Sequence, residues 1–334
     1  MSSPTLTMIL PNFNHGRFVA RAIEAATSQS RPPDEFLILD DASTDQSAEI
    51  IASYAERFPS IAFFRNERNE GHLKGMKKLL EKATGDWVYC GAADDYVLPG
   101  FFERAVSIVE KHPQAALVFG PMVHEDPQGR RLRTTTVSRW RRDLFANSER
   151  FLREYLDWEP PSHSLSAATV YRREALQAIG GFPEELASWC DSFAIRALGL
   201  QHGACYLRQP CVSVTMLPGA YSKQIGKDFQ RAMNLVSLAA SKMRSPAFRG
   251  IFPEDHVRRW EGAYRNWILL NKALPFELDV DWATLGKAAD LLKPIDPLDR
   301  LAVRVANTGT RALWSLLWRR VMARYRKADY GPST

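Results

Sequence analysis

The sequence predicts an α/β fold, a mostly parallel sheet with helices on both faces, followed by a C-terminal helical region. Two observations carry this prediction. Between residues 5 and 119, short apolar runs alternate with helical patterns of about ten residues, as in parallel strands joined by crossover helices. From about residue 223 onward, apolar residues recur at helical spacing only. A domain boundary is therefore expected near residue 220.

The first part of the chain is expected to supply five strands and four helices. The strands are short apolar runs, expected at 5–10, 35–40, 61–65, 87–91 and 116–119. The helices have apolar residues three and four positions apart, and they are expected at 18–26, 50–58, 73–83 and 101–111. Ser43 or Thr44 is the expected N-cap of the second helix.

Beyond Pro121 the regular alternation breaks. A turn is expected at 128–131, strands at 167–171, 204–207 and 212–216, and helices at 148–156, 172–179 and 191–200. The last part of the chain shows helical patterns at 229–243, 257–274, 282–292 and 298–325.

The 334-residue chain has the composition of an ordinary globular protein. Its 45% hydrophobic and 25% charged residues exclude disordered and fibrous classes. The net charge of +6 is modest for this length, so no nucleic-acid partner is expected. The four cysteines show no C-x-x-C spacing, which argues against a zinc site or a disulfide framework. With no signal peptide and no apolar run of about 18 residues, a cytoplasmic protein is expected.

Polar residues directly follow three of the predicted strands. They are Pro11-Asn12, Asp40-Asp41 and Asp94-Asp95. Because ligands bind at the carboxyl ends of parallel strands, these residues are expected to converge on one edge of the sheet. The first aspartate pair has a structural alternative, which is to cap the following helix. The carboxylates of the second pair, Asp94 and Asp95, repel each other unless a cation or hydrogen-bond donors offset their charge. A divalent ion bound by these carboxylates together with substrate phosphates would offset it.

Two common nucleotide-binding loops are absent, since neither G-x-G-x-x-G nor G-x-x-x-x-G-K-[ST] follows the first strand. Instead the chain carries, in order, Ile-Leu-Pro-Asn-Phe-Asn, Leu-Asp-Asp-Ala-Ser-Thr-Asp, Asn-Glu-Gly, Ala-Thr-Gly-Asp-Trp and Ala-Asp-Asp-Tyr-Val-Leu-Pro-Gly. Over residues 5–222 this order resembles the family 2 glycosyltransferases of the GT-A fold. The resemblance implies transfer of a sugar from a nucleoside-diphosphate sugar, most commonly a UDP-sugar, to an acceptor hydroxyl. It further implies inversion at the anomeric carbon and the use of Mg²⁺ or Mn²⁺.

The same resemblance assigns site residues. It divides a catalytic domain at 1–220 into a nucleotide-sugar part, 1–121, and an acceptor part, 122–220. The implied donor-binding residues are Pro11, Asn12, Asn14, Asp40, Asp41, Gly71, Lys74, Asp94, Asp95, Ser222 and Lys223. Asp94 and Asp95 would also bind the metal. Two positions depart from the family: it commonly has D-x-D-D where this chain has Ala-Ala-Asp-Asp, and it often has His where Leu217 stands.

Inverting transfer needs a base that deprotonates the acceptor hydroxyl. The family places this carboxylate at the start of a helix after a Gly-Gly-Phe segment, which this chain has at 180–182. Asp191 is the acid immediately before the predicted helix and is therefore the implied base. Glu184 and Glu185 are alternative candidates, and a plain N-cap is the structural alternative for Asp191.

The acceptor is expected to be a glycan, a lipid-linked glycan or a protein, with His163 and Trp189 on its side of the site. Residues 301–327 contain seven basic residues and no acid, and Trp314 and Trp318 lie on an apolar face. This composition leaves two interpretations open. The segment binds the anionic inner face of the plasma membrane, or its apolar face packs on the catalytic domain or in a homodimer. The region 221–334 is accordingly expected to associate with membrane or to oligomerise.

Two further interpretations of the sequence are alternatives to glycosyl transfer. A non-catalytic nucleotide-sugar-binding or scaffold protein would tolerate the missing first aspartate and the missing histidine. A sugar nucleotidyltransferase would need a Gly-rich, Arg-containing loop after the first strand, which residues 11–16 lack. The residues do not distinguish uridine from guanosine or thymidine donors.

Overall fold

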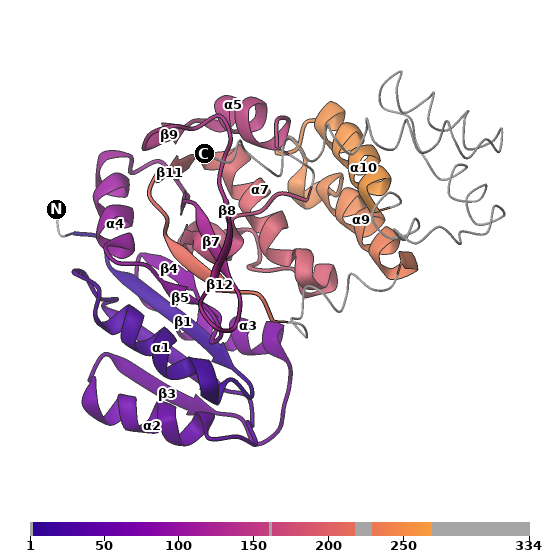
Figure 1. Ribbon diagram of the computed structural model, residues 1–334. Coiled ribbons are helices and arrows are strands. Elements are labelled where there is room, and N and C mark those ends of the chain that lie inside the picture. The colour runs from indigo at the N-terminus through magenta and orange to yellow at the C-terminus, as the bar shows by residue number, and fades with distance from the viewer. Residues whose placement is uncertain (1–2, 160–161, 218–228, 269–334) are drawn as a thin grey trace. The chain divides into compact units, whose positions relative to one another are not determined.

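The computed structural model describes residues 3–159, 162–217 and 229–268 (Figure 1). The chain divides into two compact units. The first is formed by residues within 1–152 and 164–218, and the second by residues within 153–163 and 219–334. The first unit contains two sheets with their helices, and the described part of the second is helical.

An eight-stranded sheet forms the centre of the first unit, in the order β3-β2-β1-β4-β10-β6-β11-β9. Its strands are β1 (Leu6–Asn12), β2 (Glu35–Asp40), β3 (Ile61–Arg65), β4 (Trp87–Cys90), β6 (Leu117–Phe119), β9 (Leu144–Ala146), β10 (Thr169–Arg172) and β11 (Ala204–Tyr206). Strands β1 to β4 are parallel to one another, as the sequence predicted for this part of the chain. Every residue of β1 is buried, which explains its nearly continuous apolar sequence.

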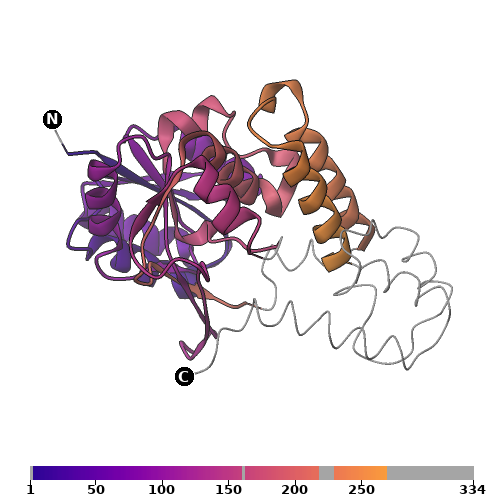
Figure 2. The same ribbon diagram turned by 90° about the horizontal axis from the view of Figure 1, so that it is seen from above.

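Helices α1 (Gly16–Thr27), α2 (Ser47–Arg57), α3 (His72–Lys82) and α4 (Phe101–Lys111) accompany these strands (Figure 2). The chain steps from β1 to β2 to β3 and then returns to β4 on the other side of β1. Because such crossovers are right-handed, α1 and α2 lie on one face of the sheet and α3 on the other. Gly75 lets α3 approach the sheet closely, since an added Cβ atom would lie 3.3 Å from Leu39 and 3.4 Å from Pro11.

Strand β10 departs from the expected parallel arrangement. It lies between β4 and β6 and is antiparallel to both, with Val170 aligned with Tyr89 on one side and with Val118 on the other. Strand β9 is also antiparallel to its neighbour β11. The sheet is therefore mixed beyond β4, although β6 and β11 are parallel.

A second, four-stranded sheet was not expected from the sequence. Its order is β5 (Tyr96–Val97), β12 (Val212–Thr215), β7 (Met122–Glu125) and β8 (Arg131–Thr135) (Figure 1). The turn predicted at 128–131 is the connection of the β7–β8 hairpin, where the amide of Asp126 donates to the carbonyl of Arg130. This sheet joins the segment that follows Asp95 to the strand that precedes Leu217.

Aromatic side chains fill the core beneath the far end of the large sheet. Phe119 of β6 contacts Trp140, Phe151 and Tyr206 with ring centroids 5.9 to 6.3 Å apart. Each such pair adds about 0.5–1.5 kcal/mol beyond the burial of its area. The cluster fixes β6, β11 and the segment around Trp140 relative to one another.

The remaining helices largely follow the predicted ranges. They are α5 (Ser148–Phe151), which continues as a π-helical turn at Leu152–Leu156, then α6 (Arg173–Ala178), α7 (Cys190–His202), α9 (Phe229–Met243) and α10 (Glu254–Ile268), with 3₁₀ turns at Ser166–Ala168, Glu184–Trp189 and Pro246–Phe248. Within the second unit, Arg244 pairs with Glu254 and Glu261 across α9 and α10. The helices predicted at 282–292 and 298–325 lie outside the described residues. Among the helices that are described, none has the length and apolarity needed to cross a bilayer.

Candidate active site

The ends of β1 and β2 are joined by a buried hydrogen-bond network centred on Asp40. This side chain has no exposed surface. It accepts from the Asn12 amide at 2.8 Å and from the Ser43 hydroxyl and amide at 2.5 and 3.1 Å. Arg65 lies 3.3 Å from its second oxygen. Asp40 thus holds the strand ends together, and a nucleoside could reach it only by breaking these bonds.

The same network corrects the expected cap of α2. Pro11 and Asn12 belong to β1 rather than to the loop after it, and Asn14, at φ 55°, receives the Thr44 amide on its side-chain oxygen. Because Ser43 is engaged by Asp40, the helix starts later, with Gln46 at the N-cap position and Asp45 accepting the Ser47 amide. The prediction of Ser43 or Thr44 as N-cap was therefore wrong.

Asp41 anchors the loop that leads into α3. One carboxylate oxygen accepts from the Asn66 amide at 2.7 Å and the Glu70 backbone at 2.9 Å, and the other accepts from Gly71 at 2.8 Å. Gly71 has φ 96°, a left-handed conformation that favours glycine. Lys78 also holds this loop, since its ammonium group lies 3.0 Å from the side-chain oxygens of both Asn66 and Glu70.

The aspartate pair lies where the first sheet meets the second. The Thr215 amide donates to Asp95 at 2.8 Å, and the Thr215 hydroxyl donates to the Asp94 carbonyl at 2.6 Å. Asp95 is buried, whereas Asp94 is half-buried. Burial, and next the neighbouring Asp94 carboxylate, raise the pKa of Asp95 well above its ordinary value, against the opposing effects of the Thr215 amide and Arg21. A cation at this position would relieve both causes of the raised pKa.

The donor set for a metal ion consists of these two carboxylates. Among the described residues, no group of three or more His, Cys, Asp or Glu side chains is placed to hold an ion. Mg²⁺ is commonly bound through one or two carboxylates together with substrate phosphates and water. The Asp94-Asp95 pair therefore fits an ion shared with a diphosphate, even without the first aspartate of D-x-D-D.

Asp191 lies in the first turn of α7, next to the end of β4. The N-cap of this helix is Trp189, so Asp191 is not the cap; it accepts the Ser192 amide at 2.5 Å. Burial raises the pKa of Asp191, while the Ser166 hydroxyl, the Ser192 amide and Arg196 act in the opposite direction. Just before the helix, Ala187 has φ 50°, a strained conformation for a residue with a side chain. A half-buried carboxylate with a raised pKa is suited to act as a general base.

The two carboxylate groups lie around the same strand end. The charge of Asp95 contributes to the raised pKa of Tyr89, and the charge of Asp191 contributes to the raised pKa of Cys90, after burial in each case. Tyr89 and Cys90 are the last two residues of β4. Asp95 and Asp191 therefore both lie within electrostatic reach of the end of β4.

The raised pKa of Asp191 predicts a particular pH dependence. At saturating Mn²⁺, the acid limb of kcat/KM for a reaction that uses Asp191 as its base is expected above 3.8, the ordinary pKa of an aspartate, because the base must be ionised. Activity should therefore be lost as pH falls through this raised pKa. A pH series of nucleotide release measures the limb, and activity that stays constant down to about pH 4 would contradict a buried base.

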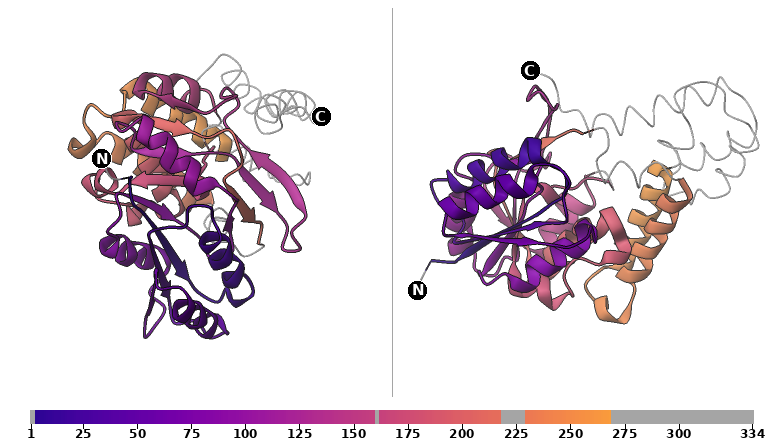
Figure 3. Two further views of the ribbon diagram at one scale, coloured as in Figure 1. Left: turned by 90° about the vertical axis from the view of Figure 1, so that its left-hand side faces the viewer. Right: turned by 90° about the horizontal axis from the view of Figure 1, so that it is seen from below.

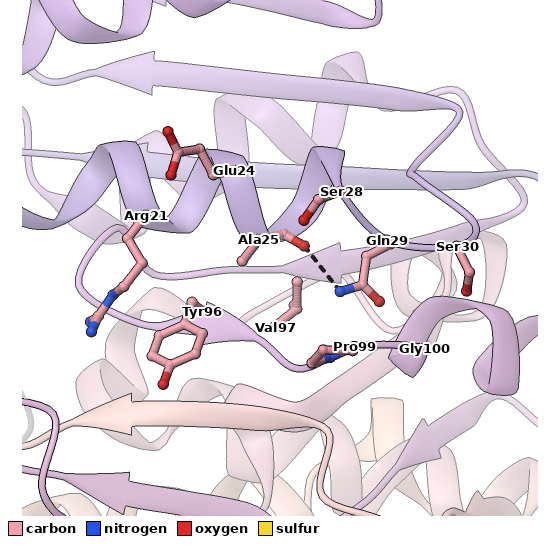
Figure 4. A pocket seen from close by; sticks show the side chains of 10 residues that line it. All are labelled: Arg21, Glu24, Ala25, Ser28, Gln29, Ser30, Tyr96, Val97, Pro99 and Gly100. Atoms are coloured by element: carbon pink, nitrogen blue, oxygen red, sulfur yellow. Dashed lines mark hydrogen bonds between the residues drawn. The ribbon is translucent and has the colours of Figure 1, made fainter.

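Sequence reasoning missed Arg21 of α1. Its guanidinium donates to the Asp94 carbonyl at 3.2 Å and to the Thr215 hydroxyl at 2.9 Å, and it stacks 4.3 Å from the Tyr96 ring centroid. Arg21 also lines a pocket of about 780 Å³ between α1 and the segment 96–100 (Figure 4). The predicted donor residues are not among the lining residues of this pocket. Nothing in the local sequence distinguishes Arg21 from a solvated helix residue.

Two more residues at this edge were not predicted as site residues. Phe13 follows Asn12 and is 39% exposed, unusual for a large apolar side chain. His72 starts α3 and lies within electrostatic reach of Asp94, Asp41 and His15. The exposed aromatic residue could have been found from its place between two loop asparagines, but His72 could be placed only once the register of α3 was known.

Other predicted site residues are dispersed or undescribed. Lys74 is exposed on α3, and Glu184 is 42% exposed and lies 3.8 Å from Lys77. Trp189 stacks with Arg196, whose guanidinium carbon lies 5.1 Å from the ring centroid. His163 contacts Tyr155 within the second unit. Ser222 and Lys223 lie outside the described residues.

Comparison with known protein families identifies the class to which this protein belongs. Residues 7–180 match the family described as glycosyl transferase family 2. Because this match covers just over half of the chain, the chain belongs to that family. The alternative of a non-catalytic binding protein is not supported by this membership.

Individual relatives agree with this class. The chain is 32% identical over 129 residues to the putative glycosyltransferase EpsE of Bacillus subtilis (strain 168). The aligned region covers 38% of this chain and 46% of EpsE. The chain thus matches about half the length of that relative. Staphylococcus aureus TarS 1–349 in complex with UDP-GlcNAc is 18% identical, with a TM-score of 0.67 over 98% of this chain and 93% of that one. The mannosyltransferase PcManGT from Pyrobaculum calidifontis, in complex with GDP-Man and Mn²⁺, is 20% identical, with a TM-score of 0.55 over 100% and 89%. At these identities the likeness shows the fold, and it confirms the predicted GT-A-like architecture.

Proposed function

We propose that the chain transfers a sugar from a UDP-sugar to an acceptor hydroxyl with inversion, in the synthesis of a polysaccharide, a lipid-linked glycan or another glycoconjugate. The observation that carries this proposal is the gathering of Asp41, Asp94-Asp95 and Asp191 at the carboxyl ends of β2 and β4. Asp41 would recognise the nucleoside, Asp94 and Asp95 would bind the diphosphate through a metal ion, and Asp191 would deprotonate the acceptor. Complexes of TarS with UDP-GlcNAc and of PcManGT with GDP-Man support a nucleotide-sugar donor.

In the proposed reaction Asp191 accepts the proton of the acceptor hydroxyl. The acceptor oxygen forms a bond to the anomeric carbon as the bond from that carbon to the diphosphate oxygen breaks, and the nucleoside diphosphate leaves with the bonding electrons. Inversion requires the base and the leaving group to lie on opposite faces of the sugar ring. Partial burial of Asp191 raises its pKa, which makes the carboxylate a stronger base.

A divalent cation, Mg²⁺ or Mn²⁺, is part of the proposal. Asp95 and Asp94 would hold it, and when bound it would neutralise charge that develops on the leaving diphosphate. The Thr215 amide holds the Asp95 carboxylate in place, and the Thr215 hydroxyl and Arg21 hold the backbone carbonyl of Asp94. Phe13 offers an exposed aromatic face near the Asp41 loop on which a nucleobase could stack.

The donor proposal predicts metal-dependent nucleotide binding. UDP is expected to bind to the full chain more tightly with Mn²⁺ than with EDTA, because Asp94 and Asp95 would hold an ion whose charge attracts the diphosphate. Isothermal titration calorimetry under the two conditions measures the difference. Equal affinity in Mn²⁺ and EDTA would remove the metal from the proposal, and tighter binding of GDP or dTDP would change its nucleoside.

Attachment to the membrane remains a prediction for residues 301–327, which lie outside the described residues. The full chain is expected to float with anionic but not with neutral vesicles, and high salt should weaken the binding, because each Lys or Arg near an anionic surface contributes about 1 kcal/mol. Flotation measures this, with Trp314→Ser combined with Trp318→Ser as the variant that should reduce it. Absence of flotation, together with a homodimer in sedimentation analysis, would favour the oligomerising alternative.

A further inference from the structure

A dense run of arginines leaves the second sheet next to the candidate site. Residues 130–142, here called the arginine segment, contain six arginines and no lysine, aspartate or glutamate. The segment therefore carries as much charge as the formal +6 of the whole chain. All six arginines are exposed, namely Arg130, Arg131, Arg133, Arg139, Arg141 and Arg142.

Most of this charge is not neutralised by carboxylates. Arg130 pairs with Asp126 at 3.0 Å. Arg131, Arg133, Arg141 and Arg142 form no ion pair with an acidic residue in the described part of the chain. Since a guanidinium group presents a planar set of donors that fits carboxylate and phosphate oxygens, these side chains are available to an anionic ligand.

The backbone that displays the arginines is fixed. Val137 and Trp140 are almost fully buried, and Trp140 packs in the aromatic cluster with Phe119 and Tyr206. The first part of the segment forms strand β8, paired with β7. A ligand would therefore meet a surface that is largely formed in advance, which lowers the entropic cost of binding.

The segment also lies beside the aspartate pair. Thr215, whose amide binds Asp95, is aligned with Glu125 of β7, and Glu125 is aligned with Arg131 of β8. Because neighbouring strands are about 4.8 Å apart, the backbone of Arg131 lies about 10 Å from that of Thr215. Figure 1 shows β12, β7 and β8 side by side in this order. An acceptor chain bound along the segment would thus have one end near the proposed site of transfer.

Protection of an exposed edge strand explains only part of this pattern. β8 is the last strand of its sheet, and charged residues on such strands discourage pairing with other chains. One or two charges on β8 would be sufficient for that purpose, yet arginines continue beyond β8 to Arg141 and Arg142. Leu132 is the one large apolar residue of the segment that is exposed, since Val137 and Trp140 are buried, so little apolar surface accompanies the charge. This argues against insertion into a membrane.

We propose that the arginine segment binds an anionic acceptor glycan, a chain with repeated carboxylate or phosphate groups, and leads it to the Asp94-Asp95 edge. This inference rests on the proposed glycosyl transfer and names the class of its acceptor. The cationic side chains recognise the repeated charge of the chain, while the hydroxyl that reacts lies at the end that reaches Asp191.

The test compares two double variants of the full chain. In Arg131→Gln with Arg133→Gln, the Kd for an oligogalacturonide is expected to rise roughly threefold to thirtyfold, as the loss of two exposed charge pairs implies. The control, Arg249→Gln with Arg258→Gln, removes two exposed arginines from the second unit and should leave this Kd unchanged. Binding by the unmodified chain should weaken with added salt, and a neutral maltodextrin of matched length should not bind.

Several outcomes would overturn the inference. They are equal affinity of the unmodified chain and the Arg131/Arg133 variant, equal loss in the control, or a larger loss of binding to anionic vesicles or duplex DNA than to the oligogalacturonide in the Arg131/Arg133 variant. UDP binding with Mn²⁺ is measured on the same proteins and is expected to be unchanged. If the unmodified chain binds UDP but its affinity for the oligogalacturonide does not depend on Arg131 and Arg133, only the proposed class of acceptor is refuted. If the unmodified chain binds no nucleotide, the proposed function itself is refuted.

Discussion

Replacing Asp191 with asparagine is expected to lower turnover by roughly 10²-fold or more, the usual contribution of a general base. Asparagine keeps the size of the side chain and can still accept the Ser192 amide, but it cannot take a proton. Nucleotide affinity should be nearly unchanged, because Asp191 is not part of the proposed donor site. Steady-state measurement of UDP release, combined with calorimetric titration of UDP, separates the two effects.

The same variant is expected to be at least as stable as the unmodified chain at neutral pH. Burial raises the pKa of Asp191 above its value in the unfolded chain, so the folded state favours the protonated form. The ionised carboxylate therefore costs stability above the folded pKa. As pH falls through that pKa the cost disappears, and the difference between the two proteins should vanish. Thermal unfolding at neutral and acidic pH measures this trend.

Glu184 supplies the matched control for the base. It lies at the start of the turn that precedes α7 and is 42% exposed, paired with Lys77 on the surface. Glu184→Gln should retain near-normal turnover. If Glu184→Gln lost activity while Asp191→Asn kept it, the base would have to be reassigned.

Replacing Asp95 with asparagine is expected to abolish most of the enhancement of UDP binding by Mn²⁺ and to lower turnover by about 10²-fold, as is typical when one electrostatic contact to a transition state is lost. The amide oxygen can still accept from Thr215, so the connection between the two sheets should remain. The variant therefore removes charge and leaves the fold largely intact. Calorimetry with Mn²⁺ and with EDTA measures the first effect and UDP release the second.

Two further variants test whether the loss of metal-dependent UDP binding is specific to Asp95. Asp255→Asn removes an exposed carboxylate of the second unit that pairs with Arg258, and it should change neither quantity. Asp94→Asn should weaken the metal effect less than Asp95→Asn, because Asp94 is only half-buried and more water can replace it. A larger loss in Asp94→Asn would move the main metal ligand to Asp94.

The first four strands and their helices could be predicted because each is a local pattern. β1 and β2 are buried along almost their whole length, so their sequences are nearly continuous apolar runs, and α1 buries Val19, Ala22, Ile23 and Ala26 at helical spacing. The second sheet could not be predicted in the same way. β5 has two residues and pairs with β12, more than 100 positions later in the sequence, so no local pattern predicts this strand.

The site was predicted to the level of loops but not of atoms. Asp40 and Asp41 are adjacent in sequence, and the sequence does not show which of the two faces inward. Successive side chains at the end of a strand point in opposite directions, so Asp40 enters the network of Asn12 while Asp41 reaches the loop of Gly71. The contact of Arg21 with the Asp94 carbonyl depends on how α1 packs against β5, which is a property of the fold.

The central position of β10 has a consequence for synthesis of the chain on the ribosome. β4 and β6 are complete by residue 119, but the strand that separates them is not made until residues 169–172. Until then both strands present unpaired backbone edges, which are templates for pairing with other chains. A nascent chain or proteolytic fragment that stops before Thr169 should therefore aggregate, and the sheet can close only after a delay set by elongation at about 5–20 residues per second.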